Sequence, residues 1–146
     1  MLVLSLPHPF AFAAIAFTMT VAPLYYKTSA RGVVLVHAPR MSVPRDRHAP
    51  SEFLQDWSHV TNGWYETFQT DPPCTASYLR MAEISGGILG MVEITDCVKE
   101  HDSPWMPNTG WGLVLRGSRP LPFTPCPGIA GIWECQPRIL RTLGIA

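Results

Sequence analysis

The chain has 146 residues, 47% of them hydrophobic, and its 11 basic residues balance its 11 acidic residues. This length suits one domain with one core, and the apolar content excludes a disordered chain. The 15 prolines and a charged fraction of only 15% exclude a long helical bundle and favour a loop-rich fold. We therefore expect one domain over residues 1–136 and a C-terminal tail over residues 137–146.

The first 26 residues contain no Lys, Arg, Asp or Glu, which raises the question of an export signal or a membrane span. A signal needs a basic start and an unbroken apolar run, but no basic residue is present and Pro7 and Pro9 interrupt the run. A span needs about 20 uninterrupted apolar residues, and two threonines and a third proline interrupt this stretch. Composition leaves both alternatives open beside a third, the first strand and helix of a soluble domain.

Local patterns predict, in chain order, short strands over residues 2–6, 20–26, 33–37, 88–98, 110–115 and 131–135. Short helices are predicted over residues 10–17, with Pro9 in the first turn, and over 53–57, 64–68 and 75–83, with Thr61-Asn62-Gly63 as a breaker and Thr75 as a cap. Residues 39–50 form a loop and 119–122 an extended connection. The set predicts an α+β fold, a small mixed β-barrel flanked by short α-helices.

The charges are distributed unevenly along the neutral chain. Basic residues predominate from Lys27 to Arg47 and again from Arg116 onward, whereas acidic residues predominate from Glu52 to Asp102. This asymmetry permits a basic face for a phosphate-bearing partner, although solvated surface charge is the commoner role of any single arginine.

Four cysteines, Cys74, Cys97, Cys126 and Cys135, allow two disulfides in principle. The sequence contains no C-x-x-C pair, and no histidine stands at metal-ligand spacing from a cysteine. We therefore expect free, buried thiols in a reducing cytoplasm. We also expect neither a metal site nor a cofactor.

The order of motifs carries a resemblance to a known family. Eleven positions of the opening match the family pattern without a gap: Leu4, Ser5, Leu6, Pro9, Phe10, Ala11, Thr28, Arg31, Gly32, His37 and Ala38. A glycine-led strand at 86–98 follows, then Ser103-Pro104-Trp105 and the segments 110–115, 119–122 and 128–133, in the family's order. On these residues the chain resembles an ASCH domain, a member of the PUA-like superfamily, from Leu4 to about Trp133.

The resemblance implies a PUA-like β-barrel with a cleft beside the first helix that binds RNA or modified nucleosides, in cytoplasmic proteins without a membrane partner. Some relatives are amidohydrolases for acetylated cytidine or ribonucleases, whose activity is associated with a lysine, a nearby polar residue and a carboxylate of the central strand. Here the lysine position holds Met19, and Phe17, Ala22 and Leu24 replace three other family residues. Methionine has no titratable amine, so we expect binding without catalysis. Glu93 remains as a candidate acid or base.

Five residues are candidates for binding RNA or a nucleoside. Lys27, Thr28 and Arg31 form a basic, polar turn that suits phosphate, and an arginine can grip a phosphate through two hydrogen bonds. Turn chemistry is the alternative. It is favoured for Thr28, whereas phosphate binding is favoured for Arg31. Trp105 and Trp111 offer rings for stacking on an unpaired base. Core packing is the alternative, favoured for the strand residue Trp111 and open for the loop residue Trp105.

Two other functions stay open from sequence. One is a hydrolase that uses Glu93 with Thr28 or an arginine as partner. The other is a structural domain whose apolar cleft, lined by Phe17, Met19 and Leu24, is a contact surface for another protein.

Overall fold

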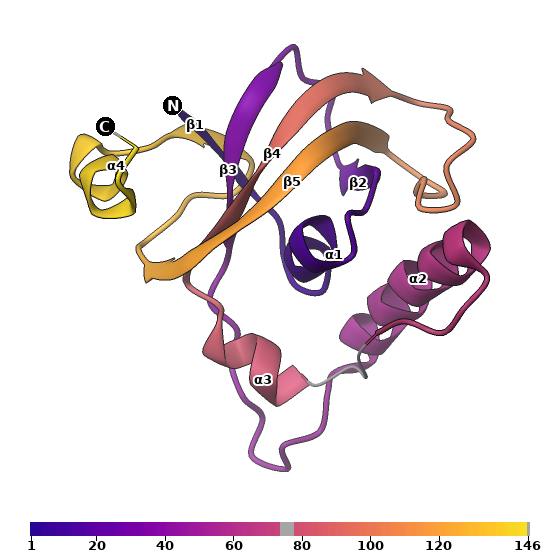
Figure 1. Ribbon diagram of the computed structural model, residues 1–146. Coiled ribbons are helices and arrows are strands. Elements are labelled where there is room, and N and C mark those ends of the chain that lie inside the picture. Colours follow the sequence, from indigo (N-terminus) through magenta and orange to yellow (C-terminus); the bar gives the residue numbers. More distant parts are fainter. Residues whose placement is uncertain (74–77, 146) are drawn as a thin grey trace.

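The computed structural model describes residues 1–73 and 78–145 (Figure 1). Within them one sheet has six strands: β1 (Leu2–Ser5), β2 (Val21–Leu24), β3 (Gly32–Ala38), β4 (Gly87–Val98), β5 (Trp111–Pro125) and β6 (Ile132–Glu134). Their order is β2-β5-β4-β3-β1-β6, with β1 and β3 parallel and the other neighbours antiparallel. The fold is α+β, as predicted. The sheet curls into a half-barrel, so the predicted barrel is open, with β2 and β6 at its edges.

The described residues form four helices: α1 (Phe10–Ala16), α2 (Ser51–Phe68), α3 (Tyr78–Glu83) and α4 (Pro137–Leu143). Of these, α1 and α4 contact the strands. α1 lies within the curve of the sheet, and α2 lies beyond it (Figure 1). The alanines of α1 let the helix approach the strands closely, and Ala11, Ala13 and Ala14 are fully buried. No helix in the described ranges is long and apolar enough to cross a bilayer.

The segment predicted as a C-terminal tail contains α4. Its Ile139, Leu140 and Leu143 pack against a second apolar cluster around Val3 and Leu35, on the other face of the sheet. This contact places the end of the chain beside its beginning, where the terminal amine of Met1 lies 2.7 Å from a carboxylate oxygen of Glu134.

The opening of the chain folds as the patterns predict, as strand, helix, strand and strand in β1, α1, β2 and β3. Phe17, Met19 and Leu24 lie inside the main core, at 0%, 2% and 7% exposure. The hypothesis that these three side chains line an exposed contact surface is therefore wrong, because the chain's own core covers them.

α2 corrects the prediction of two short helices separated at Gly63. The helix continues through this glycine because a side chain from a distant loop occupies the space beside it. A Cβ atom on Gly63 would lie 2.1 Å from the Trp105 indole, and that indole donates a hydrogen bond of 2.9 Å to the carbonyl of Val60. Gly63 is therefore a packing position rather than a helix end.

β5 corrects the prediction that residues 119–122 are only a connection between elements. The strand continues to Pro125 and pairs with β4 between Gly112 and Pro125, with three register shifts and with Pro120 opposite Gly90. β2 pairs only with the first part of β5, from Trp111 to Val114. Beyond Val114 that side of β5 is an open edge, where a proline without an N–H group is tolerated.

The expected helix cap Thr75 lies outside the described residues, as does Cys74. The other three cysteines, Cys97, Cys126 and Cys135, are free and buried, which confirms the prediction for them. Burial raises the pKa of the Cys126 and Cys135 thiols. Across the described residues, no group of three or more His, Cys, Asp or Glu side chains is arranged to hold a metal ion.

Candidate functional site

One end of the sheet gathers four of the predicted site residues. β2 and β4 end there and β3 and β5 begin there, because Leu24 pairs with Trp111 and Val98 pairs with Gly112. Lys27 and Thr28 follow β2, Arg31 precedes β3, and Trp111 opens β5. Lys99, which was not predicted, follows β4 at the same end.

Two ammonium groups lie over one indole at this end. The distance to the centroid of the Trp111 ring is 5.7 Å from Lys27 Nζ and 4.9 Å from Lys99 Nζ, within the range of cation–π attraction. These are the only two lysines in the sequence. Trp111 is partly buried against the core. We call Lys27, Lys99 and Trp111 the lysine–tryptophan cluster.

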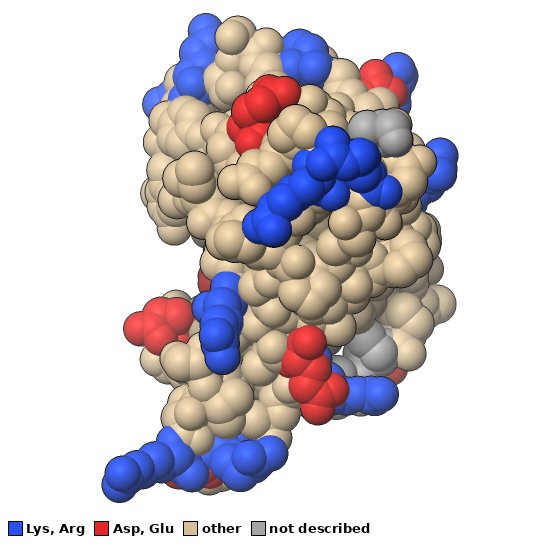
Figure 2. Space-filling view, turned by 90° about the vertical axis from the view of Figure 1, so that its left-hand side faces the viewer, with Lys and Arg blue, Asp and Glu red and all other residues tan. Residues whose placement is uncertain are grey.

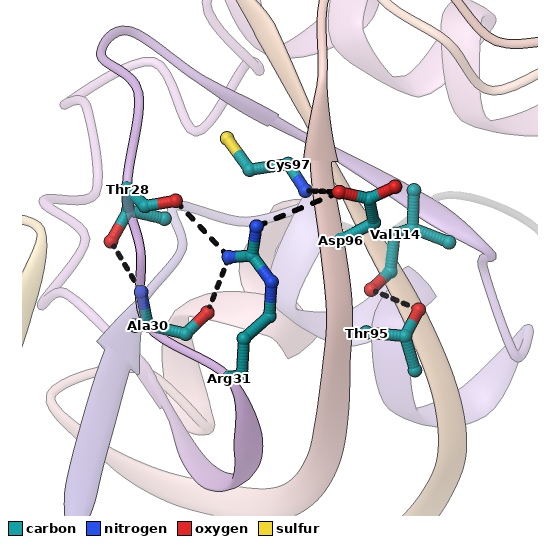
Figure 3. A network of polar contacts seen from close by, with 7 residues as sticks. All are labelled: Thr28, Ala30, Arg31, Thr95, Asp96, Cys97 and Val114. Carbon is teal, nitrogen blue, oxygen red and sulfur yellow. Dashed lines mark hydrogen bonds and ion pairs between the residues drawn. The ribbon is translucent and has the colours of Figure 1, made fainter.

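Arg31 and Thr28 hold the loop between β2 and β3 in place (Figure 3). Arg31 Nη1 donates hydrogen bonds to the carbonyls of Thr28 and Ala30, at 3.1 and 2.8 Å, and Nη2 lies 3.5 Å from Asp96 Oδ1. The Thr28 hydroxyl accepts a hydrogen bond of 3.1 Å from the Ala30 amide. These contacts are the turn chemistry that was the alternative for both residues, and they tie the loop to β4.

Trp105 lies apart from this end of the sheet. Its side chain is 1% exposed and packs under α2, and its carbonyl accepts a hydrogen bond of 2.8 Å from His59 Nε2. The ring therefore presents no face on which a base could stack. Of the two alternatives for Trp105, core packing is the one that agrees with this placement.

Glu93 lies on β4 and is bound by an arginine from β5. Arg116 Nε and Nη2 donate hydrogen bonds to Oε1 and Oε2 of Glu93, both at 3.0 Å. The bond to Glu93 raises the pKa of Arg116 above its ordinary value. Both oxygens of the carboxylate thus accept hydrogen bonds from Arg116. Of the two partners expected for Glu93 in a hydrolase, the structure brings an arginine to it and not Thr28.

A cleft of 480 Å³ lies between the start of α1, the end of β2, α2 and the loop before β5. Its size is typical of small-molecule sites. Its polar lining consists of Tyr25, Gln55, Asp56, His59, Asn108 and Thr109. Burial, which is the largest cause, and the charge of Glu52 raise the pKa of the Asp56 carboxyl, while His59 opposes the rise. Tyr25 stands two residues before Lys27 and Thr109 two residues before Trp111, so the cleft and the lysine–tryptophan cluster share chain segments.

No family model and no curated protein matches this chain. On the face that carries α4, basic side chains stand in separate groups, with uncharged surface and acidic side chains between them (Figure 2). That face therefore shows no broad basic surface. The pairing of two lysines with the Trp111 ring is the more specific indication of a ligand-binding site.

Proposed function

We propose that the chain is an ASCH-like module that binds single-stranded RNA through the lysine–tryptophan cluster. The observation that carries this proposal is the convergence of the only two lysines on Trp111. Ammonium groups bind phosphate, and an indole stacks on any unpaired base. Proteins that bind single strands without sequence preference combine these two contacts.

The proposal has a second part: one nucleoside of the RNA binds in the neighbouring cleft, beside the base that stacks on Trp111. Gln55 and Asn108 each offer an amide that both donates and accepts, and Asp56 offers an acceptor. These groups are the kind that read the hydrogen-bonding edge of a base. We propose binding without turnover, because Met19 supplies no titratable amine and both carboxylate oxygens of Glu93 accept hydrogen bonds from Arg116. The proposed location is the cytoplasm.

Fluorescence anisotropy with a labelled single-stranded RNA tests the proposal. If two phosphates are neutralised, the plot of log affinity against log salt has a slope of about −1.4. A double-stranded RNA of the same sequence is the control, since it offers no free base to Trp111, and it should bind more weakly. Absence of binding at low salt would contradict the proposal.

Lysine footprinting locates the contact, because the chain has only two lysines and one terminal amine. An acetylating reagent removes the charge of each amine that it reaches. Bound RNA should protect Lys27 and Lys99 but not the amine of Met1, which is paired with Glu134. Equal protection of all three amines, or of none, would place the RNA elsewhere.

A further inference from the structure

A second cavity lies at the opposite end of the sheet from the lysine–tryptophan cluster. Its volume is 670 Å³, within the range of ligand pockets. The ends of β1 and β3, where Ser5 pairs with His37, form one wall. The loop between β5 and β6 forms the other. The lining includes Ser5, His37, Arg40, Cys126, Gly128 and Ala130.

The surroundings of His37 hold its ring in one tautomer. The residue is only 3% exposed, and its Nε2 lies 3.0 Å from the carbonyl oxygen of Cys126. A carbonyl only accepts, so Nε2 carries the hydrogen, and Nδ1 of the neutral ring keeps a lone pair. That Nδ1 lies 3.5 Å from Ser5 Oγ, the loose spacing that unliganded nucleophile–base pairs often show. Pro127 restricts the backbone of Cys126 and so helps to keep the carbonyl in place.

Besides His37, Ser5 has two hydrogen-bond partners beside the cavity. Its hydroxyl donates to the carbonyl of Ile129 at 2.7 Å and accepts from the Trp133 indole N–H at 3.0 Å. The indole N–H stabilises negative charge on this oxygen. The amides of Gly128 and Ala130, in the loop that lines the cavity, donate no hydrogen bond to any described residue. Because both residues line the cavity, their amides are the candidate donors to an oxyanion there.

We infer that Ser5 is the nucleophile of a second site, which hydrolyses small esters that carry a negative charge. The Ser5 hydroxyl first turns its hydrogen from the Ile129 carbonyl to His37 Nδ1. Oγ then forms a bond to the ester carbonyl carbon while the proton moves to Nδ1. The bond to the alcohol oxygen then breaks, and that oxygen takes the proton from His37. Water attacks the acyl-Ser5 ester, gives one proton to His37 and releases the acid, and Ser5 recovers that proton. The net reaction turns an ester and water into an acid and an alcohol.

Arg40 sets the charge of the substrate. Its side chain lines the same cavity and forms no ion pair with a described residue, whereas the rest of the lining is mostly proline, glycine and aliphatic. A guanidinium binds a carboxylate or a phosphate through paired hydrogen bonds. The substrate is therefore a small ester with an anionic group on its acyl or alcohol part.

Labelling of the intact chain with a fluorophosphonate tests the nucleophile. Peptide mapping by mass spectrometry should find one adduct, on Ser5. No adduct, or an adduct only on another serine, would overturn the inference. Because this experiment uses the wild-type chain, a variant that fails to fold cannot affect its result. Ser5→Ala should abolish labelling, whereas Ser58→Ala, at an exposed position of α2, should label at the wild-type rate.

His37→Gln tests the base, because glutamine can still donate to the Cys126 carbonyl but cannot take the Ser5 proton. Labelling should slow by at least about 100-fold, with circular dichroism confirming the fold. Arg40→Gln should raise KM for the 4-nitrophenyl monoester of succinic acid and leave KM for 4-nitrophenyl acetate unchanged. Wild-type labelling rates in His37→Gln, or equal KM effects on both esters, would contradict these roles.

Discussion

Trp105 and Trp111 stand six positions apart in the sequence and have opposite environments. Trp105 follows a loop proline, yet it is 1% exposed and donates its indole N–H to α2. Trp111 opens a strand, yet it is partly exposed under two lysines. The comparison teaches that the element in which a tryptophan lies does not decide its role. Its role depends on how the rest of the fold surrounds the ring. The missing side chain of Gly63 leaves space in which the Trp105 ring is buried under α2, whereas the Trp111 ring stays partly exposed.

Removing each ring gives the largest contrast. Trp105→Ala should lower the free energy of unfolding by about 3–5 kcal/mol, because it removes a buried ring and leaves a cavity. Trp111→Ala should cost about 1 kcal/mol, a common value for a partly buried position. Urea unfolding followed by circular dichroism measures both. Equal losses for the two variants would remove the distinction between a core ring and a surface ring.

Gly63→Ala should destabilise the protein by about 1–3 kcal/mol, because the new methyl group would overlap the Trp105 indole. At a solvent-exposed helix position the same change stabilises by about 1 kcal/mol. Ser58→Ala, on the exposed side of the same helix, is the matched control and should stay within about 0.5 kcal/mol.

The coupling between Gly63 and Trp105 can be tested directly. In a Trp105→Ala background the clash is absent, so Gly63→Ala should become stabilising. A double-mutant cycle measures this coupling. If Gly63→Ala has the same effect in both backgrounds, then Trp105 is not the reason for the glycine.

A smaller effect is expected at the lysine–tryptophan cluster. Lys99→Met should make the salt slope of RNA binding shallower by about 0.7, which is the contribution of one phosphate contact to a single strand. Arg141→Met, on the exposed side of α4, should leave the slope unchanged. Equal changes in both variants would indicate general charge attraction rather than contact at Trp111.

The smallest effect is expected near the start of α2, where His8 lines a cavity with Arg40, Glu52, Phe53 and Asp56. Burial lowers the pKa of His8, although its hydrogen bond to the Ile84 carbonyl opposes the shift. The unfolded chain therefore binds a proton more readily than the folded chain, so stability should fall as the pH drops below about 6.5.

His8→Gln isolates this effect. The difference in urea midpoint between the wild type and His8→Gln should change between pH 7.5 and pH 5.5, with the wild type losing more stability on acidification. A difference that does not vary with pH would contradict the role of His8.

The sequence predicts the parts of this fold that local patterns control. The opening from β1 to β3 follows from apolar periodicity and from the position of Pro9. The continuity of α2 through Gly63 was missed because its cause, Trp105, comes from another part of the chain. The length of β5 was missed because proline is tolerated only where the partner strand β2 has ended, and pairing is not visible in sequence.

The candidate site was predicted in part for the same reason. Lys27 and Trp111 were found as separate signals, and Trp105 was grouped with them although it packs elsewhere. Lys99 was missed because only the sheet register brings the end of β4 to the start of β5. The scarcity of lysine was a usable signal, since each of the two lysines lies just after a predicted strand.

The most direct test of RNA binding at Trp111 is the affinity of Trp111→Ala and Trp111→Phe for single-stranded RNA at one low salt concentration. Loss of a stacked base costs about 1–3 kcal/mol, so Trp111→Ala should bind roughly 5- to 150-fold more weakly. Trp111→Phe keeps a ring and should recover most of the affinity. Wild-type affinity in Trp111→Ala, with the fold intact, would contradict the proposed interface.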